Sequence, residues 1–309
     1  MAVSYGFIPP SGIKPAEGAD YTQILRTDDM ARLRGPMFGL LAFSLYAVIV
    51  VAVSSLVRSI TRAINDRGLS AEEYNRQASQ MMFPEGMLAH HLGIISLIGL
   101  SVLLVWGLHR INPGYLASVT GRVRWRYLLA CLLISAVVIA AYLGLVPLVT
   151  GTPVTIHPQP EFVWFAVVIV LTTPFQSIAE EVFFRGYLLQ SLGAAMKTPW
   201  FGILTSALLF ALAHGVQDPW LFGTRYAFGV LAALLVVRTG GLEAAAAIHV
   251  MNNVFTFGQA GLTGTISAVF TVSQVPWYTS VGSVVLFAVM AALCYLVARK
   301  MHLQTRVGE

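Results

Sequence analysis

Charged residues are scarce in this sequence, at 11% of its 309 residues, whereas a typical soluble domain carries about 25%. Hydrophobic residues make up 57% of the chain, and the mean hydropathy is +0.74. The apolar residues occur in repeated long runs, and a membrane-spanning helix needs about 20 such residues. The composition therefore excludes an ordinary soluble domain and predicts an all-α, polytopic membrane protein.

Cysteine is also scarce, because Cys131 and Cys294 are the only two, and each lies inside an apolar run. This excludes a disulfide framework and a metal site built from cysteines. The net charge is +5 and the pI is about 9.4, but the sequence contains no zinc-finger spacing, P-loop or RNA-binding signature. We therefore expect no nucleic-acid partner, and we interpret the basic residues as orientation signals.

About eight apolar stretches are candidates for spanning the bilayer, and the fifth and sixth are short. They lie near residues 38–57, 87–108, 127–149, 162–183, 200–214, 224–238, 242–262 and 277–298. We expect a flexible cytoplasmic tail over residues 1–37, a single transmembrane domain over 38–298, and a cytoplasmic tail over 299–309. The sequence shows neither internal repeats nor the paired broken helices of many transporters.

Basic residues flank both ends of the predicted transmembrane domain, whereas loop 150–161 contains no lysine or arginine. The flanking residues are Arg26, Arg32, Arg34, Arg299, Lys300 and Arg306. The positive-inside rule then places both termini in the cytoplasm and residues 58–85 outside. The expected location is the lipid bilayer of a bacterial plasma membrane.

Residues 58–85 form a polar segment between the first two spans. Ser70 and Glu73 have the spacing of a capping box, which predicts a surface helix. Glu72, Glu73 and Arg76 lie among asparagine, glutamine and serine. We interpret them as the solvated face of that helix.

The stretch IAEEVFFRG, residues 178–186, places two carboxylates and an arginine after an apolar run. A charge at mid-membrane costs about 2.5–3.5 kcal/mol on insertion scales, so such groups face the protein interior and usually have a function. Glu181 and Arg185 have i,i+4 spacing and can pair on a helix. Glu180 points about 100° away. We therefore expect one neutralised carboxylate and one that is free for chemistry.

Chain spacing predicts that His214 meets Glu180. A turn at Lys197–Pro199 separates them, and each lies about 25 Å from that turn at 1.5 Å per residue. An antiparallel helical hairpin therefore brings both to the same depth. The tip of this hairpin, residues 187–197, is expected to protrude on the cytoplasmic side.

His249 and Asn253 provide the third element, because their i,i+4 spacing places them on one face of an alanine-rich helix. A lone intramembrane histidine or asparagine usually joins helices by hydrogen bonds. Several such groups on three helices, with an unpaired carboxylate among them, favour a functional cluster. By contrast, we interpret His90, His91 and His109, at the ends of the second span, as interfacial residues.

Three motifs occur in order: Glu180-Glu181-x-x-x-Arg185, Phe210-x-x-x-His214 and His249-x-x-x-Asn253. Together they resemble the CPBP family of intramembrane proteases. This family includes the eukaryotic CAAX prenyl endopeptidase and bacterial bacteriocin-processing and immunity proteins. The resemblance covers roughly residues 160–262.

The resemblance implies a peptidase in which Glu180, helped by His214, activates a water molecule. His249 and Asn253 would bind the oxyanion of the tetrahedral intermediate, with Glu181 and Arg185 in support. The residue types suit these roles, because a carboxylate can act as a general base and both His249 and Asn253 can donate hydrogen bonds. The expected substrate is a membrane-embedded or lipid-anchored peptide or protein.

Some members of that family have been described as metalloproteases, and a zinc site of Glu180, His214 and His249 is an alternative. We favour no metal or other cofactor, because no H-E-x-x-H motif occurs and three separate helices would supply the ligands. Two other functions remain open. One is a catalytically inactive membrane partner or peptide-binding immunity or regulatory protein of the same fold, and the less favoured one is a proton-coupled transporter.

Overall fold

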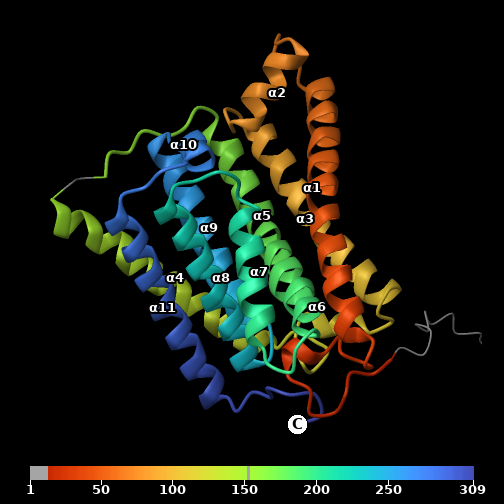
Figure 1. Cartoon of the computed structure of the whole chain (residues 1–309). Coiled ribbons are helices and arrows are strands. Elements are labelled where there is room, and N and C mark those ends of the chain that lie inside the picture. The colour runs from red at the N-terminus through yellow and green to blue at the C-terminus, as the bar shows by residue number, and fades with distance from the viewer. Residues whose placement is uncertain (1–12, 152–153) are drawn as a thin grey trace, which may run out of the picture.

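The computed structural model describes residues 13–151 and 154–309, and over these residues the regular structure is helical (Figure 1). Six helices in this part of the chain are long and apolar enough to cross a membrane. They are α1 (Ala31–Ile64), α3 (Pro84–Gly107), α4 (Trp125–Thr150), the continuous helical segment Phe162–Gly193, α8 (Pro219–Thr239) and α11 (Trp277–Lys300). The predicted all-α polytopic membrane fold is confirmed.

The two remaining predicted spans are also helices, but each departs from an ordinary lipid-facing span. Helix α7 (Trp200–Leu212) has 13 residues, which is short for a bilayer. Helix α9 (Glu243–Thr263) has 21 residues, but His249, Asn252 and Asn253 lower its hydropathy. It packs against α4, α5, α8 and α11, so the bundle buries His249 and partly buries Asn252 and Asn253. The short elements are η1 (Tyr21–Gln23), α2 (Ala71–Ser79), η2 (Pro113–Leu116) and α10 (Ile266–Thr271).

Helices α1 and α3 pack against each other and are joined by α2, which lies at the far end of this pair in Figure 1. Ser70 caps α2, because its hydroxyl accepts a hydrogen bond from the Glu73 amide at 3.2 Å. The predicted surface helix is therefore present, although the Glu73 carboxylate pairs with Arg76. Gly86 of α3 is required where the helices meet, because a Cβ there would lie 2.2 Å from the Ala78 carbonyl oxygen.

The N-terminal segment differs from the flexible tail predicted over residues 1–37. Residues 1–12 lie outside the described part, but the chain from residue 13 packs on the bundle. Tyr21 is buried and donates a hydrogen bond to the Leu116 carbonyl. Gln23 donates to the carbonyls of Gly193 and Met196 at 2.9 and 3.0 Å.

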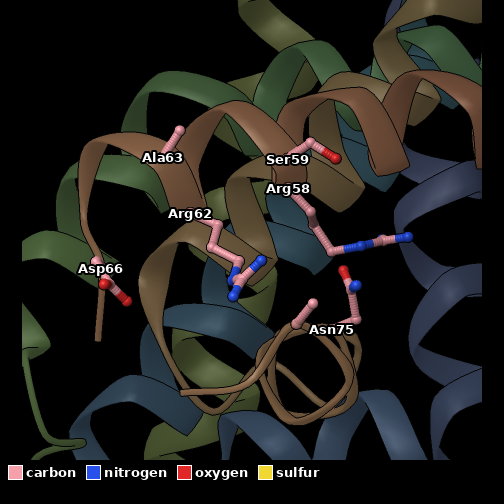
Figure 2. A pocket seen from close by; sticks show the side chains of 7 residues that line it. Arg58, Ser59, Arg62, Ala63, Asp66 and Asn75 are labelled. Carbon is pink, nitrogen blue, oxygen red and sulfur yellow. The ribbon is translucent and has the colours of Figure 1, made fainter. Parts of the chain in front are cut away.

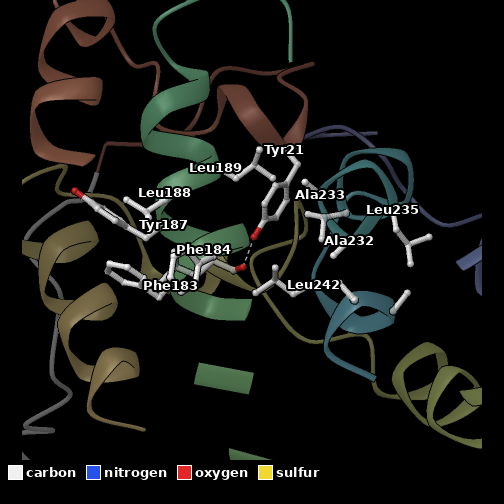
Figure 3. Close-up of a cluster of buried hydrophobic side chains, with 14 of the residues drawn as sticks. Tyr21, Phe183, Phe184, Tyr187, Leu188, Leu189, Ala232, Ala233, Leu235 and Leu242 are labelled. Carbon is white, nitrogen blue, oxygen red and sulfur yellow. Dashed lines mark hydrogen bonds between the residues drawn. The ribbon is translucent and has the colours of Figure 1, made fainter. Parts of the chain in front are cut away.

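This packing also changes the predicted hairpin tip, because Tyr187 to Ala194 are buried and do not protrude. Figure 3 shows Tyr21 beside Leu189 and Ala233 in the apolar core. Gly193 allows the close approach, because a Cβ there would meet the Thr22 carbonyl oxygen at 2.7 Å. The apolar tip is therefore covered by a segment that is remote in sequence.

The predicted C-terminal tail, residues 299–309, pairs with the N-terminal segment. The Gly18 amide donates to the Val307 carbonyl at 2.8 Å, and the Val307 amide donates to the Ala19 carbonyl at 3.0 Å. Both ends of the described chain therefore lie at the same end of the bundle as the loop between α3 and α4 (Figure 1).

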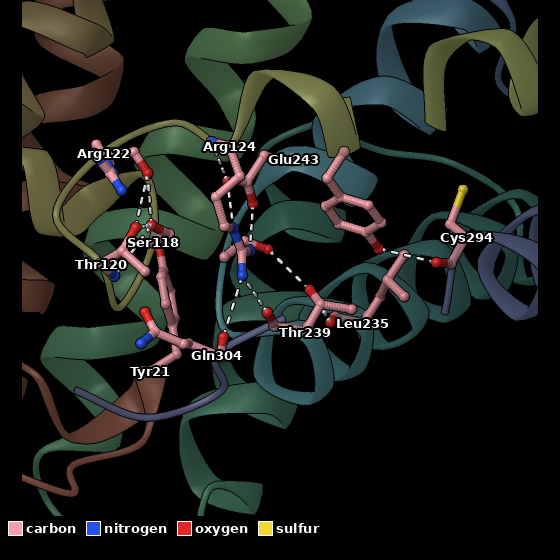
Figure 4. Close-up of polar contacts among 12 residues, drawn as sticks. Tyr21, Ser118, Thr120, Arg122, Arg124, Leu235, Thr239, Glu243, Cys294 and Gln304 are labelled. Atoms are coloured by element: carbon pink, nitrogen blue, oxygen red, sulfur yellow. Dashed lines mark hydrogen bonds and ion pairs between the residues drawn. The ribbon is translucent and has the colours of Figure 1, made fainter. Parts of the chain in front are cut away.

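A buried ion pair fixes the start of α4 against the turn between α8 and α9 (Figure 4). The Arg124 guanidinium donates to both carboxylate oxygens of Glu243, at 2.8 and 2.6 Å. It also donates to the carbonyls of Thr239 and Gln304 at 2.8 and 3.2 Å. Because the Glu243 side chain is only 2% exposed, this carboxylate depends on Arg124 for its neutralisation.

Replacement of Arg124 should therefore destabilise the fold strongly. Removing one partner of a buried ion pair costs about 3–5 kcal/mol, because the other charge is left buried and unpaired. We expect Arg124→Ala to lower the free energy of unfolding by that amount, measured by denaturant titration in detergent. The exposed Arg122 is the matched control, and Arg122→Ala should change it by less than about 0.5 kcal/mol. Equal effects of the two substitutions would contradict this role of the pair.

Candidate active site

The helix that carries the two adjacent carboxylates changes its geometry immediately after them. Helix α5 (Phe162–Glu181) continues into η3 (Val182–Leu188), a π-helical segment, and then into α6 (Leu189–Gly193). π-helical turns are rare and frequently lie at functional sites. Arg185 lies inside this segment and is fully buried. The wider turn therefore sets the direction of a charged side chain inside the bundle.

Glu181 accepts two charge-assisted hydrogen bonds on the same oxygen. Arg185 Nη1 lies 3.0 Å from Glu181 Oε1, as the i,i+4 spacing predicts. His249 Nδ1 of α9 lies 2.7 Å from the same oxygen. The side chains of Glu181 and Arg185 are both 0% exposed. Glu181 thus has a second partner that the sequence prediction did not include, and this partner joins α5 to α9.

Glu180 is not free of partners, contrary to the sequence prediction, because its Oε2 lies 3.2 Å from His249 Nε2. The imidazole of His249 therefore lies between two carboxylates. If both carboxylates are ionised, both ring nitrogens carry a hydrogen and His249 is a cation. The formal charges of Glu180, Glu181, Arg185 and His249 then sum to zero, as burial in a low-dielectric interior favours.

Aromatic rings surround the Arg185 guanidinium. Its carbon lies 4.1 Å from the ring centroid of Phe210 and 5.3 Å from that of Phe228, which gives cation–π stabilisation. Gly229 of α8 permits the close packing of this layer, since a Cβ there would lie 2.9 Å from the Ala207 Cβ. The phenylalanine of the Phe210-x-x-x-His214 motif thus contacts the arginine of the first motif.

A cavity of about 500 Å³ lies beside this charged set. Its wall includes all four predicted catalytic side chains, which come from α5, the turn after α7, and α9: Glu180, His214, His249 and Asn253. Glu181 and Arg185 do not line it. The structure therefore brings the predicted catalytic residues together and places the two supporting residues behind them.

His214 occupies the turn that follows α7, two residues after the end of the helix, although the predicted span ran to residue 214. Gly215 has φ +80°, which ends the helix at this point. His214 Nδ1 lies 2.7 Å from the Phe210 carbonyl oxygen. A carbonyl only accepts hydrogen bonds, so Nδ1 carries the hydrogen and a neutral His214 keeps its lone pair on Nε2. That nitrogen can accept a proton in the cavity.

Asn253 is held by α5 through its amide group. Its Nδ2 donates to Gln176 Oε1 at 3.2 Å and to Ser177 Oγ at 3.1 Å. Its Oδ1 accepts a hydrogen bond from Asn252 Nδ2 at 3.1 Å. In this arrangement both amide hydrogens of Asn253 are engaged, so an oxyanion would have to compete with α5 for them.

Sequence reasoning missed several polar residues that line the same cavity, among them His90, Gln176, Asn252 and Arg225. Two of these had a usable signal. Gln176 is four residues before Glu180 and therefore lies on the same helical face, and Arg225 is a charge within an apolar span. His90 was interpreted as interfacial, but α3 places its ring 5.3 Å from Phe270 in the cavity wall.

The other two histidines of that group have structural contacts away from the cavity. His91 is buried, and its Nδ1 lies 2.6 Å from the Thr172 hydroxyl oxygen. His109 Nε2 lies 3.3 Å from the Tyr187 hydroxyl oxygen. His91 therefore helps to join α3, and His109 the loop after α3, to the segment Phe162–Gly193.

The side chains of Glu180, His214 and His249 do not form a zinc site as they are placed here. Across residues 13–151 and 154–309, no group of three or more histidine, cysteine, aspartate or glutamate side chains has an arrangement that could hold a metal ion. Both nitrogens of His249 are engaged by carboxylates, so neither is available as a ligand.

Comparison with known families agrees with the motifs. Residues 160–255 match the family described as type II CAAX prenyl endopeptidase Rce1-like. This segment is similar to that family, and the match supports a CAAX-protease-like intramembrane peptidase fold. It contains Glu180, His214, His249 and Asn253.

The chain is also similar to a bacterial protein over part of its length. The chain is 31% identical over 123 residues to the uncharacterized protein YyaK of Bacillus subtilis (strain 168), over 37% of this chain and 41% of that protein. The chain thus matches less than half the length of this relative. No solved structure matches the chain.

Proposed function

We propose that this protein is an intramembrane endopeptidase in which Glu180 activates water for attack on a peptide bond. The observation that supports this most directly is the shared cavity, which collects Glu180, His214, His249 and Asn253 inside an apolar bundle. Peptide hydrolysis requires a base, hydrogen-bond donors for the oxyanion and a proton donor for the leaving amine. The cavity wall contains candidates for each.

Activation of water is assigned to Glu180 and His214. The Glu180 carboxylate accepts a proton from a water molecule in the cavity, and the resulting hydroxide attacks the carbonyl carbon of the scissile bond. His214 has its Nε2 lone pair available, because Nδ1 is hydrogen-bonded to the Phe210 carbonyl. It can therefore hold the water molecule or receive its proton from Glu180.

Stabilisation of the oxyanion is assigned first to His249. Its Nδ1 is anchored by Glu181, so its ring orientation is fixed before substrate arrives. Its Nε2–H lies beside Glu180. In the proposed reaction, the carbonyl oxygen of the scissile bond gains its negative charge next to this hydrogen. Once Glu180 has taken a proton, Nε2–H can transfer its hydrogen bond to the oxyanion. Asn253 contributes by exchanging its bond to Gln176 or Ser177 for one to the oxyanion.

Collapse of the tetrahedral intermediate completes the reaction. The C–N bond breaks as the proton held by Glu180, directly or through His214, passes to the leaving nitrogen. The products are a carboxylic acid and an amine, and Glu180 returns to its ionised form. These steps need water and the residues of this chain, and none of them is routed through a metal.

The substrate proposed is a membrane-embedded or lipid-anchored peptide or protein. The aromatic and aliphatic side chains in the cavity wall suit a hydrophobic segment, and they include Tyr46, Phe228, Phe257 and Phe270. The proposed setting is a bacterial plasma membrane with both termini in the cytoplasm.

Replacement of Glu180 tests the proposed function. We expect Glu180→Gln to lower cleavage by at least about 10²-fold, because glutamine has the same shape but cannot accept the proton. Membrane proteomes of cells that express the wild-type or the variant protein would be compared for precursors that accumulate uncleaved. Glu72→Gln, at an exposed position on α2, is the control and should cleave normally. If a folded Glu180→Gln protein cleaved precursors as well as the wild type does, the proposal would be refuted.

Removal of metal tests the metal-free reaction separately. Exhaustive treatment of the purified protein with a strong chelator should leave its cleavage rate unchanged, because both nitrogens of His249 already bind carboxylates. Elemental analysis of the same sample would report any zinc that remains. If activity disappears with the zinc and returns when zinc is added, the reaction depends on a metal and the roles assigned above are incorrect.

A further inference from the structure

Two arginines near the C-terminal end of α1 line a hollow. This hollow is separate from the cavity of the candidate active site. The hollow has a volume of about 360 Å³ and lies between the last two turns of α1 and the helix α2. Figure 2 shows the Arg58 and Arg62 side chains pointing from α1 into this space, with Asn75 of α2 opposite. The two arginines are four residues apart and therefore share one helical face.

Neither arginine has an acidic partner among the ion pairs of residues 13–151 and 154–309. Arg58 donates one hydrogen bond to the Ser55 hydroxyl at 2.9 Å, and Arg62 donates one to the Leu69 carbonyl at 3.3 Å. The Nε atoms of both are buried and lack a hydrogen-bond partner. Each guanidinium thus makes one hydrogen bond and no ion pair within the described chain, so it keeps donors for a ligand.

The nearby carboxylates are mostly engaged elsewhere. Glu73 pairs with Arg76, whereas Glu85 and Glu161 both pair with Arg67. Arg67 holds the pKa of the Glu161 carboxyl below its usual value. Asp66 is the acidic residue that lines the hollow itself, and it is exposed and accepts a hydrogen bond from the Gly68 amide. The hollow therefore keeps a net positive charge.

The position of the two arginines along α1 indicates which layer of the membrane they meet, and therefore which kind of ligand they can bind. Residues 35–57 of α1 contain no charged side chain, and at 1.5 Å per residue they span about 34 Å, close to the ~30 Å hydrocarbon core of a bilayer. Arg58 is the first charged residue after this stretch, and Arg62 lies about 6 Å further along the axis. The polar headgroup layer is about 5–8 Å thick on each side. Both arginines therefore lie at headgroup depth.

We propose that Arg58 and Arg62 bind the phosphate of an anionic phospholipid headgroup in the leaflet on the α2 side. Guanidinium groups match phosphate oxygens well, because their planar donors can form paired hydrogen bonds. The hollow is more than ten times the ~30 Å³ share of one water molecule, so it holds a phosphate diester. The lipid would join α1 to α2 at the edge of the bundle, away from the proposed peptidase cavity.

Native mass spectrometry of the full-length protein in detergent would test this site with defined lipids. The wild type should retain one phosphatidylglycerol molecule more tightly than a diacylglycerol of the same chain length, which lacks the phosphate. Each basic residue near an anionic lipid contributes about fivefold in affinity. The double variant Arg58→Gln/Arg62→Gln should therefore bind the first phosphatidylglycerol about 25-fold more weakly than the wild type.

Two control variants separate this site from general charge effects and from misfolding. Arg122→Gln/Arg299→Gln removes the same charge at the opposite end of the bundle and should leave the first affinity within about twofold. Asp66→Asn removes the one carboxylate in the hollow, keeps an acceptor for the Gly68 amide, and should strengthen binding. An equal loss in the two double variants, or no gain with Asp66→Asn, would overturn the proposal.

Competition with inorganic phosphate distinguishes the phosphate of a lipid headgroup from free phosphate as the ligand. Millimolar phosphate should not displace the lipid, because the lipid's acyl chains add apolar contacts that inorganic phosphate lacks. Displacement at those concentrations would identify a site for soluble phosphate and would refute the lipid assignment. Equal retention of phosphatidylglycerol and diacylglycerol would also refute it, because the arginines would then have no part in binding.

Discussion

The Glu181 carboxylate connects the charged side chains that are buried around the candidate active site. It accepts hydrogen bonds from Arg185 on its own helical segment and from His249 on α9. Charges in an apolar interior are tolerated only when they are paired and hydrogen-bonded. The π-helical segment, the rings around Arg185 and the close approach at Gly229 all serve this requirement. The positions of α5, α8 and α9 relative to one another follow from it.

This arrangement separates a fixed inner layer from a reactive outer one. Glu181 and Arg185 are fully buried and do not line the cavity, so in the proposed reaction Glu181, paired with Arg185, orients His249 without meeting substrate. Glu180 and His214 line the cavity, and each has a proton-accepting atom there. In the proposed reaction the adjacent glutamates have different tasks, because neighbouring positions on a helix point in different directions. The sharing of His249 between both carboxylates couples the two layers.

The sequence predicted local features well and long-range packing less well. Hydropathy located the spans, and i,i+4 spacing gave the Glu181–Arg185 pair, because both depend on neighbouring residues. The hydrogen bond between Glu181 and His249 depends on how α5 and α9 pack against each other, so residue spacing within one helix could not predict it. The same applies to Arg124 with Glu243 and to Tyr21 over the buried hairpin tip. His90 reaches the cavity only because α3 packs on α5.

A double-mutant cycle between Glu181 and His249 tests this account most directly, because it measures the contact that joins α5 to α9. The free energy of unfolding in detergent would be compared for the wild type, Glu181→Gln, His249→Gln and the double variant. Residues in direct contact show coupling of about 0.5–3 kcal/mol. We expect a coupling of at least ~1 kcal/mol, whereas the control cycle of Glu72→Gln with His249→Gln should be additive within about 0.5 kcal/mol. Additive effects of Glu181→Gln and His249→Gln would show that the two side chains do not meet, and the proposed site would then be wrong.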